Sequence, residues 1–95
     1  MSPSSLDLAP GTTAFLICVP NGFPQPWTTW FKTDIFGARS QLPNFGTTFT
    51  KFSNGLQLHD VGREDSGMYE CVAENRLGMM QQDAMVRVEG EILQP

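Results

Sequence analysis

The feature that most constrains this chain is a pair of cysteines with a tryptophan between them and a tyrosine close to the second. Cys18 and Cys71 lie far apart, Trp30 stands between them, and Tyr69 comes two residues before the second cysteine. A cysteine on each of two sheets, an indole packed between the sheets and a tyrosine near the start of the second cysteine's strand are typical of a two-sheet β-sandwich. The sequence therefore predicts an all-β antiparallel sandwich with Greek-key connections.

Alternating side chains and turn residues predict where the strands lie. β-rich runs recur about every 8–12 residues between Gly- and Pro-bearing turns, and no stretch keeps the 3.6-residue period of a long helix. Ser53-Asn54-Gly55 predicts a tight turn, in which Asn54-Gly55 supplies the positive φ angles that a two-residue hairpin needs. The expected elements are an edge strand within 2–10, strands at 12–19, 27–33, 38–42, 47–52, 56–59, 68–75 and 82–89, and a hairpin tip at 76–78.

Length and charge limit the classes of protein to consider. The 95 residues suffice for one domain, which we expect at 6–89, after a flexible segment at 1–5 and before a linker at 90–95, within a longer protein. No apolar run approaches the length of a membrane-spanning helix. The net charge is −4 and the six basic residues are scattered. Nucleic acid and anionic membranes need a basic patch, so we expect neither as a partner.

A long spaced motif occupies the second half of the chain. It reads Leu56-Gln-Leu58, then Val61, then Asp65-Ser-Gly67-Met-Tyr69-Glu-Cys71-Val-Ala73-Glu-Asn75-Arg-Leu-Gly78. This motif resembles the intermediate (I-set) immunoglobulin domains, whose pattern is Leu-x-Leu/Ile, Val and Asp-x-Gly-x-Tyr-x-Cys-x-Ala-x-Asn-x-x-Gly. Residues 22–32, Gly-Phe-Pro-Gln-Pro-Trp-Thr-Thr-Trp-Phe-Lys, resemble the family's Gly-x-Pro-x-Pro-x-Val-x-Trp-x-Lys. Thr28 departs from the family's usual valine.

The resemblance implies a disulfide between Cys18 and Cys71 that joins the two sheets. Such a bond would close a loop of about 54 residues and stabilise the domain by roughly 4 kcal/mol in the chain-entropy estimate. A disulfide implies an oxidising compartment. The alternative is a pair of buried free thiols, as in intracellular domains of this family.

The remaining anchors of the motif are expected to serve the fold. The hydroxyl of Tyr69 should bond backbone upstream of it, Gly67 should allow a close backbone approach, and Asp65 should cap its loop. Leu58 should point inward from its strand. The spacing favours Trp30 over Trp27 as the core indole, which leaves Trp27 either packed under the proline-rich loop at 20–26 or free to bind a partner.

No arrangement of catalytic, cofactor-binding or metal-binding residues is evident. His59 is the one histidine, and it has no nucleophile and carboxylate placed to work with it. Two cysteines and one histidine cannot complete a zinc site. Gly37 and Gly46 are isolated, so there is no glycine-rich phosphate loop. We expect no enzyme, no metal and no cofactor.

Apolar residues at outward positions suggest surfaces for protein contacts. The main candidate combines one sheet's outer face with the hairpin tip, and consists of Phe31, Val72, Met85, Leu77, Met79 and Met80, with Arg76 and Arg87 at its rim. The alternatives are scattered surface side chains or contact with a neighbouring domain. A weaker candidate is Phe15 with Ile17 on the other sheet, for which the amino-terminal strand and the loop after Trp30 are candidate covers.

By this resemblance, the chain is expected to be a non-catalytic protein–protein interaction module. It would be one immunoglobulin-like domain of a multidomain cell-surface receptor, adhesion protein or extracellular matrix protein, next to further immunoglobulin or fibronectin-like domains. Its protein partner could be a second copy or a different protein. The main alternative is a structural spacer in an intracellular titin-like or cytoskeletal protein, and a third is a regulatory domain attached to an enzyme.

Overall fold

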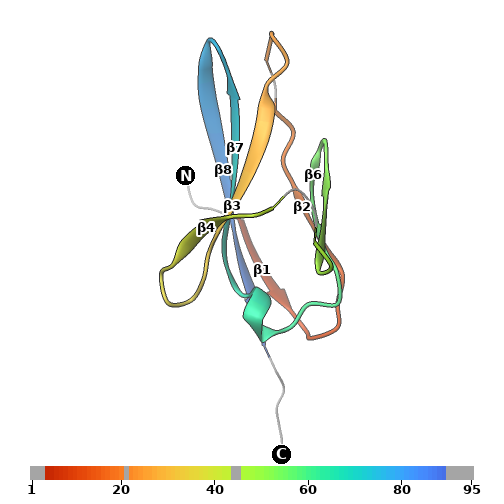
Figure 1. The fold of residues 1–95 in the computed structure, drawn as a ribbon. Helices are drawn as coiled ribbons and strands as arrows, with labels where there is room; N and C mark the ends of the chain where they lie inside the picture. Colours follow the sequence, from red (N-terminus) through yellow and green to blue (C-terminus); the bar gives the residue numbers. More distant parts are fainter. Residues whose placement is uncertain (1–3, 21, 44–45, 90–95) are drawn as a thin grey trace, which may run out of the picture.

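The computed structural model describes residues 4–20, 22–43 and 46–89, and these form two β-sheets packed face to face (Figure 1). The described residues also include one short helix, a single 3₁₀ turn. In chain order the elements are β1 (Ser4–Leu8), β2 (Ala14–Ile17), β3 (Trp27–Thr33), β4 (Arg39–Gln41), β5 (Phe49–Phe52), β6 (Gly55–Leu58), η1 (Arg63–Asp65), β7 (Gly67–Asn75) and β8 (Gly78–Val88).

One sheet has five strands in the order β1-β8-β7-β3-β4, and the other has three in the order β2-β6-β5. β1 runs parallel to β8, whereas the other pairs are antiparallel. The predicted two-sheet immunoglobulin-like sandwich is therefore confirmed. The upper part of the β7–β8 hairpin extends past the top of β6 in Figure 1. The larger sheet thus offers surface beyond the part that the smaller one covers.

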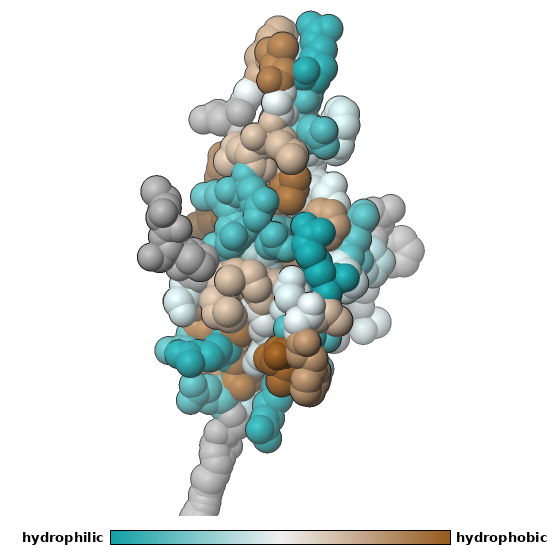
Figure 2. Space-filling view, turned by 90° about the vertical axis from the view of Figure 1, so that its left-hand side faces the viewer, coloured by the Kyte–Doolittle hydropathy of each residue, from teal (hydrophilic) through white to brown (hydrophobic). Residues whose placement is uncertain are grey.

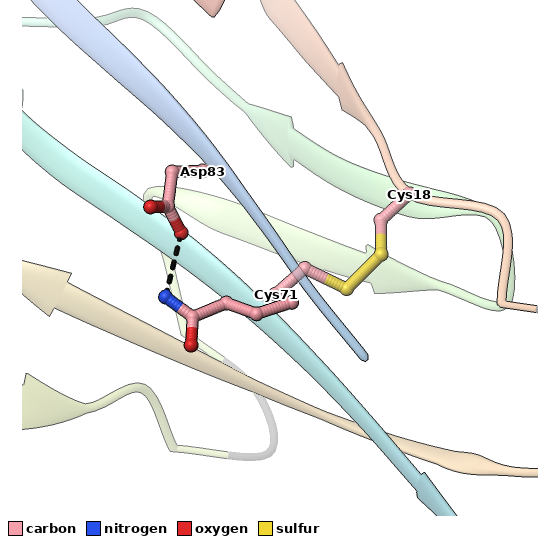
Figure 3. Close-up of a disulfide and its surroundings, with 4 residues drawn as sticks. Cys18, Cys71 and Asp83 are labelled. Atoms are coloured by element: carbon pink, nitrogen blue, oxygen red, sulfur yellow. Dashed lines mark hydrogen bonds between the residues drawn. A yellow bond between two sulfur atoms is a disulfide. The ribbon is translucent and has the colours of Figure 1, made fainter. Parts of the chain in front are cut away.

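The core lies between the sheets and is built around the predicted disulfide, which is present between Cys18 and Cys71. Figure 3 shows this bond crossing from the strand of Cys71 to Cys18 on the opposite side of the sandwich. Trp30 is buried beside it at 4% exposure, which confirms the choice of core indole. The other buried members of the cluster are Leu16, Phe49, Leu56, Leu58, Val61, Tyr69, Val86 and Val88.

A buried tyrosine fastens β7 to the loop before it. The Tyr69 hydroxyl donates a 2.6 Å hydrogen bond to the Asp65 carbonyl oxygen, and the Gly62 N–H donates to Asp65 Oδ2 at 2.8 Å. Burial, with the nearby Asp65 carboxylate as a second cause, raises the pKa of Tyr69 above its ordinary value. Gly67 has φ of 151°, and a Cβ there would collide with the Thr33 carbonyl oxygen. These contacts agree with the roles expected of all three anchors.

Two local expectations were wrong. The β5–β6 turn lies at Ser53–Asn54, within the expected segment, but neither Asn54 nor Gly55 has the expected positive φ. Gly55 is instead required because a Cβ there would meet the Leu16 carbonyl oxygen and the Phe15 ring. β8 also begins earlier than expected, at Gly78, because a two-residue turn at Arg76–Leu77 lets pairing with β7 continue to Asn75.

The expected domain limits at 6 and 89 stay a prediction. β1 begins at Ser4, within the segment expected to precede the domain. The first three residues and the expected linker at 90–95 lie outside the described residues.

Candidate protein-interaction surface

Three of the candidate binding residues share the outer face of the five-stranded sheet. Phe31 on β3, Val72 on β7 and Met85 on β8 alternate with core residues of their strands and point away from the disulfide. The alternation of inward and outward side chains along each strand predicts this outward direction. All three are half-buried by their neighbours on the same face.

A polar network crosses this outer face and divides its apolar side chains. Arg39 Nε contacts Glu70 Oε1 at 2.7 Å, and Gln81 Nε2 donates to Glu70 Oε2 at 2.8 Å and to Asp83 Oδ1 at 2.9 Å. The Arg39 guanidinium also lies 3.9 Å from the centre of the Phe31 ring. Figure 2 shows hydrophilic and hydrophobic areas alternating down this side of the molecule. The face is amphipathic, and the sequence did not reveal this division.

A hollow of about 380 Å³ lies at the lower end of the outer face, between the β3–β4 turn and β7 and β8. Ile35, Met68 and Met85 supply much of its apolar wall. The turn is held by Asp34, whose Oδ1 accepts hydrogen bonds from the Phe36 and Ala38 N–H groups, both at 2.9 Å. The sequence analysis did not select Ile35 and Phe36. Two large apolar residues next to Gly37 in a turn could have indicated an exposed apolar site there.

The other three candidates gather in a second hollow at the upper end of the molecule. This hollow of about 350 Å³ lies between the loop before β3 and the β7–β8 hairpin, and its walls include Phe23, Leu77, Met79 and Met80. Met80 pairs with Ala73 and so lies on the inward-facing side of β8, not on the outer face. The candidate surface is therefore two separate sites.

Asn75 joins the two walls of the upper hollow. Its Nδ2 donates to the Pro24 carbonyl oxygen at 2.7 Å, and its Oδ1 accepts from the Leu77 N–H at 2.9 Å. The loop and the hairpin tip are thereby held in one arrangement. Trp27 is 65% exposed and faces outward opposite Glu74, so the expectation that it packs under the loop is wrong.

The two expected rim arginines lie at different places. Arg76 is exposed in the hairpin turn beside the upper hollow. Arg87 lies near the lower hollow, where its Nε is 3.3 Å from Asp7 Oδ1 on β1. Both ends of the surface therefore combine apolar walls with a positive charge.

The amino-terminal strand does not cover the weaker candidate, which lies on the three-stranded sheet. β1 pairs with β8 in the other sheet, and Phe15 and Ile17 are 38% and 71% exposed. The Phe15 ring lies 5.9 Å from the ring of Phe52, centre to centre. These side chains form an apolar strip on the outside of β2 and β5.

The described residues contain no group of three or more histidine, cysteine, aspartate or glutamate side chains placed to hold a metal ion. His59 Nε2 lies 2.6 Å from Thr50 Oγ1 on the neighbouring strand. Within the described part of the chain, no helix has the length and apolar character needed to cross a membrane.

Comparison with known proteins places this fold in a family. Residues 1–75 match the family described as immunoglobulin domain, so the chain belongs to that family. It is 35% identical over 88 residues to neural cell adhesion molecule L1 of Homo sapiens, covering 93% of this chain and 7% of that protein. It is 33% identical over 79 residues to neurofascin of Gallus gallus, covering 83% of this chain and 5% of that protein.

Solved structures of multidomain proteins contain the same fold. The structure of the first eight immunoglobulin domains of Down syndrome cell adhesion molecule superimposes with a TM-score of 0.80 at 26% identity. The match covers 90% of this chain and 13% of that one. The chain thus spans a small part of the proteins that it resembles.

Proposed function

We propose that this chain is one protein-recognition domain of a multidomain cell-surface adhesion or receptor protein, and that it works outside the cell without catalysis. The observation that carries the proposal is the amphipathic outer face of the five-stranded sheet. The adhesion molecules among its relatives support the class of function. The disulfide supports an oxidising compartment.

The outer face has the physical character of a protein-binding surface. Phe31 and Met85 offer apolar area, while Arg39 and Glu70 offer charges that their mutual contact holds in place. The backbone of paired strands is already ordered, and the contact between Arg39 and Glu70 already holds both side chains, which lowers the entropic cost of association. Interfaces commonly combine an apolar centre with Arg and aromatic side chains. A partner with an apolar protrusion and complementary charges would fit this face.

Binding by beads coated with the domain tests this function. We expect wild-type beads to attach to intact cells, and trypsin treatment of those cells to abolish the attachment. The double variant Phe31→Ser/Met85→Ser should lose the binding, because it removes the apolar area on both sides of the polar network. The matched control Val19→Ser truncates an exposed apolar side chain that lies outside both parts of the candidate surface, and it should bind normally. Equal binding by wild type and double variant would refute the assignment to this face.

The compartment can be tested separately by counting free thiols. When cells are lysed in denaturant with a thiol-blocking reagent present, so that buried thiols are also exposed, the protein should carry no reagent at Cys18 or Cys71. Blocked thiols at both positions would favour the intracellular spacer instead.

A further inference from the structure

The upper end of the outer face carries a row of three exposed side chains from three neighbouring strands. Trp27 on β3 lies opposite Glu74 on β7, and Glu74 lies opposite Met79 on β8. Directly opposed residues point to the same side of the sheet, with Cβ atoms about 4.5–5.5 Å apart. Trp27 is 65% exposed, Met79 is 70% exposed, and Glu74 is exposed as well. Figure 2 shows hydrophobic and hydrophilic areas side by side at this end of the molecule.

The same two strands contain a second aromatic–glutamate pair, and this one holds an arginine. Phe31 lies opposite Glu70, four residues along β3 from Trp27. The Arg39 guanidinium lies 3.9 Å from the centre of the Phe31 ring, and Arg39 Nε contacts Glu70 Oε1 at 2.7 Å. One arginine thus stacks on the ring and pairs with the carboxylate at the same time. We call Phe31 with Glu70 the lower pair, and Trp27 with Glu74 the upper pair.

The upper pair has no such arginine within the described residues. Arg39 reaches the lower pair because β4 pairs with β3 at Phe31–Thr33 and not beside Trp27. Neither ion pair in the described part of the chain includes Glu74, and neither cation–ring contact there involves Trp27. Arg76 follows two residues after Glu74 in the hairpin turn and makes no contact of either kind. The upper pair therefore presents both of its groups to solvent.

We propose that the upper pair binds an arginine side chain of the protein partner, in the way that the lower pair holds Arg39. The inference rests on the proposed recognition function and names the chemistry that the partner brings to this end of the face. The guanidinium would stack on Trp27, the aromatic side chain that binds cations best, and donate to the Glu74 carboxylate. Met79 would cover the apolar stem of the arginine.

The geometry favours arginine over lysine at this place. A planar guanidinium can lie flat on an indole and direct its N–H groups sideways to a carboxylate, whereas an ammonium is a compact, strongly hydrated charge. Trp and Arg are also enriched among the side chains that carry most of the binding energy of protein interfaces. The net charge of −4 on the chain attracts a basic partner.

Titration of the 95-residue chain with a peptide that contains one arginine tests the site. The probe is acetyl-Gly-Arg-Gly-amide, and the control peptide has lysine in place of arginine, which keeps the charge. The indole N–H signal of Trp27 in nuclear magnetic resonance spectra should shift with the arginine peptide, and several-fold less with the lysine peptide. The signal of Trp30, which is 4% exposed in the core, should not move. A single exposed contact is weak, so the dissociation constant should be on the order of 10 mM.

Two substitutions divide the contributions of the pair. Glu74→Gln removes the charge and keeps the size of the side chain, so its affinity for the arginine peptide should fall about threefold. Trp27→Leu should lose the shift that the peptide causes at the backbone amide of Glu74. The matched control Glu64→Gln removes the same charge from an exposed glutamate of η1, outside the sheet, and should bind like wild type.

Beads coated with the domain test whether the arginine belongs to the cellular partner. Beads that carry Glu74→Gln or Trp27→Leu should attach to cells less than wild-type beads, whereas Glu64→Gln beads should attach equally well. Normal attachment of both variants would overturn the proposal, since the partner's arginine would then not use this pair.

Failure of the arginine site and failure of the proposed function give different results. An absent Trp27 response, or equal responses to the arginine and lysine peptides, would overturn the arginine site alone if wild-type beads still attach to cells. Wild-type beads that attach to no cell would refute the proposed function, whereas a Trp27 response that Glu74→Gln weakens would still support the arginine site.

Discussion

Removing the Tyr69 hydroxyl should destabilise the domain far more than its single hydrogen bond suggests. Tyr69→Phe keeps the ring in the core and deletes the donor of the 2.6 Å bond to the Asp65 carbonyl oxygen. The residue is 2% exposed, so water cannot readily replace the lost donor. A buried acceptor left unsatisfied costs about 1–3 kcal/mol. We therefore expect the free energy of unfolding to fall by about 2 kcal/mol, a roughly thirtyfold change in the folding equilibrium.

Urea unfolding followed by tryptophan fluorescence measures this loss directly. The midpoint should fall with little change in slope, and Tm should fall by about 8–16 °C for a domain of this size. Thr50→Val is the matched control, because it removes an exposed hydroxyl whose partner is His59 Nε2. That change should cost no more than about 0.5 kcal/mol. A loss below about 0.5 kcal/mol in Tyr69→Phe would refute the argument that this bond locks the loop to β7.

Other perturbations test the backbone, the disulfide and the buried phenol. Gly67→Ala should cost more than about 2 kcal/mol in urea unfolding, because its Cβ would collide with β3 backbone; Gly37→Ala, also at positive φ but in open space, should cost about 1 kcal/mol, and equal losses would contradict this. Replacing Cys18 and Cys71 by alanine should lower the unfolding free energy by roughly 4 kcal/mol, and an unchanged urea midpoint would contradict that estimate. Because burial raises the pKa of Tyr69, its stabilising contribution is complete below about pH 10 and is lost as the pH rises further, so the urea midpoint of wild type should fall more steeply above pH 10 than that of Tyr69→Phe.

Much of the sandwich was predictable because its strongest signals are short in range. Alternation around Cys71 identified the inward side of β7, and the same rule identified the outward side of Phe31 and Met85. The rule could also have placed Met80, since it shares the parity of Ala84 on β8. The error arose because the hairpin was expected to begin pairing later than it does.

The division of the outer face was not predictable from alternation. Glu70 is bonded by Arg39 from β4 and by Gln81 from β8. These contacts depend on which strands are neighbours and on their register, and the pattern of β4 was too weak to fix either. A list of outward apolar residues therefore overestimates how continuous their patch is.

The pairing of β1 with β8 was equally hidden in the sequence. The run from Ala14 to Ile17 predicts a strand, but only the pairing of β1 with β8 shows that β1 does not pair with β2. Local preference also failed at Asn54-Gly55, where close contact with β2 fixes the glycine more strongly than turn geometry does. Strand order is a property of the whole topology, so it needs the assembled fold.

The anchors that define the fold also decide which side chains a partner can reach. On β7, Tyr69 and Cys71 point inward, and Glu70 and Val72 between and after them point outward. A shift of one residue in register would exchange these two sets. The disulfide and the tyrosine's hydrogen bond both resist such a shift, because each fixes one residue of β7 to a point outside its sheet neighbours. The same bonds that stabilise the core therefore also fix which side chains form the outer face, and weakening them should make that face less ordered.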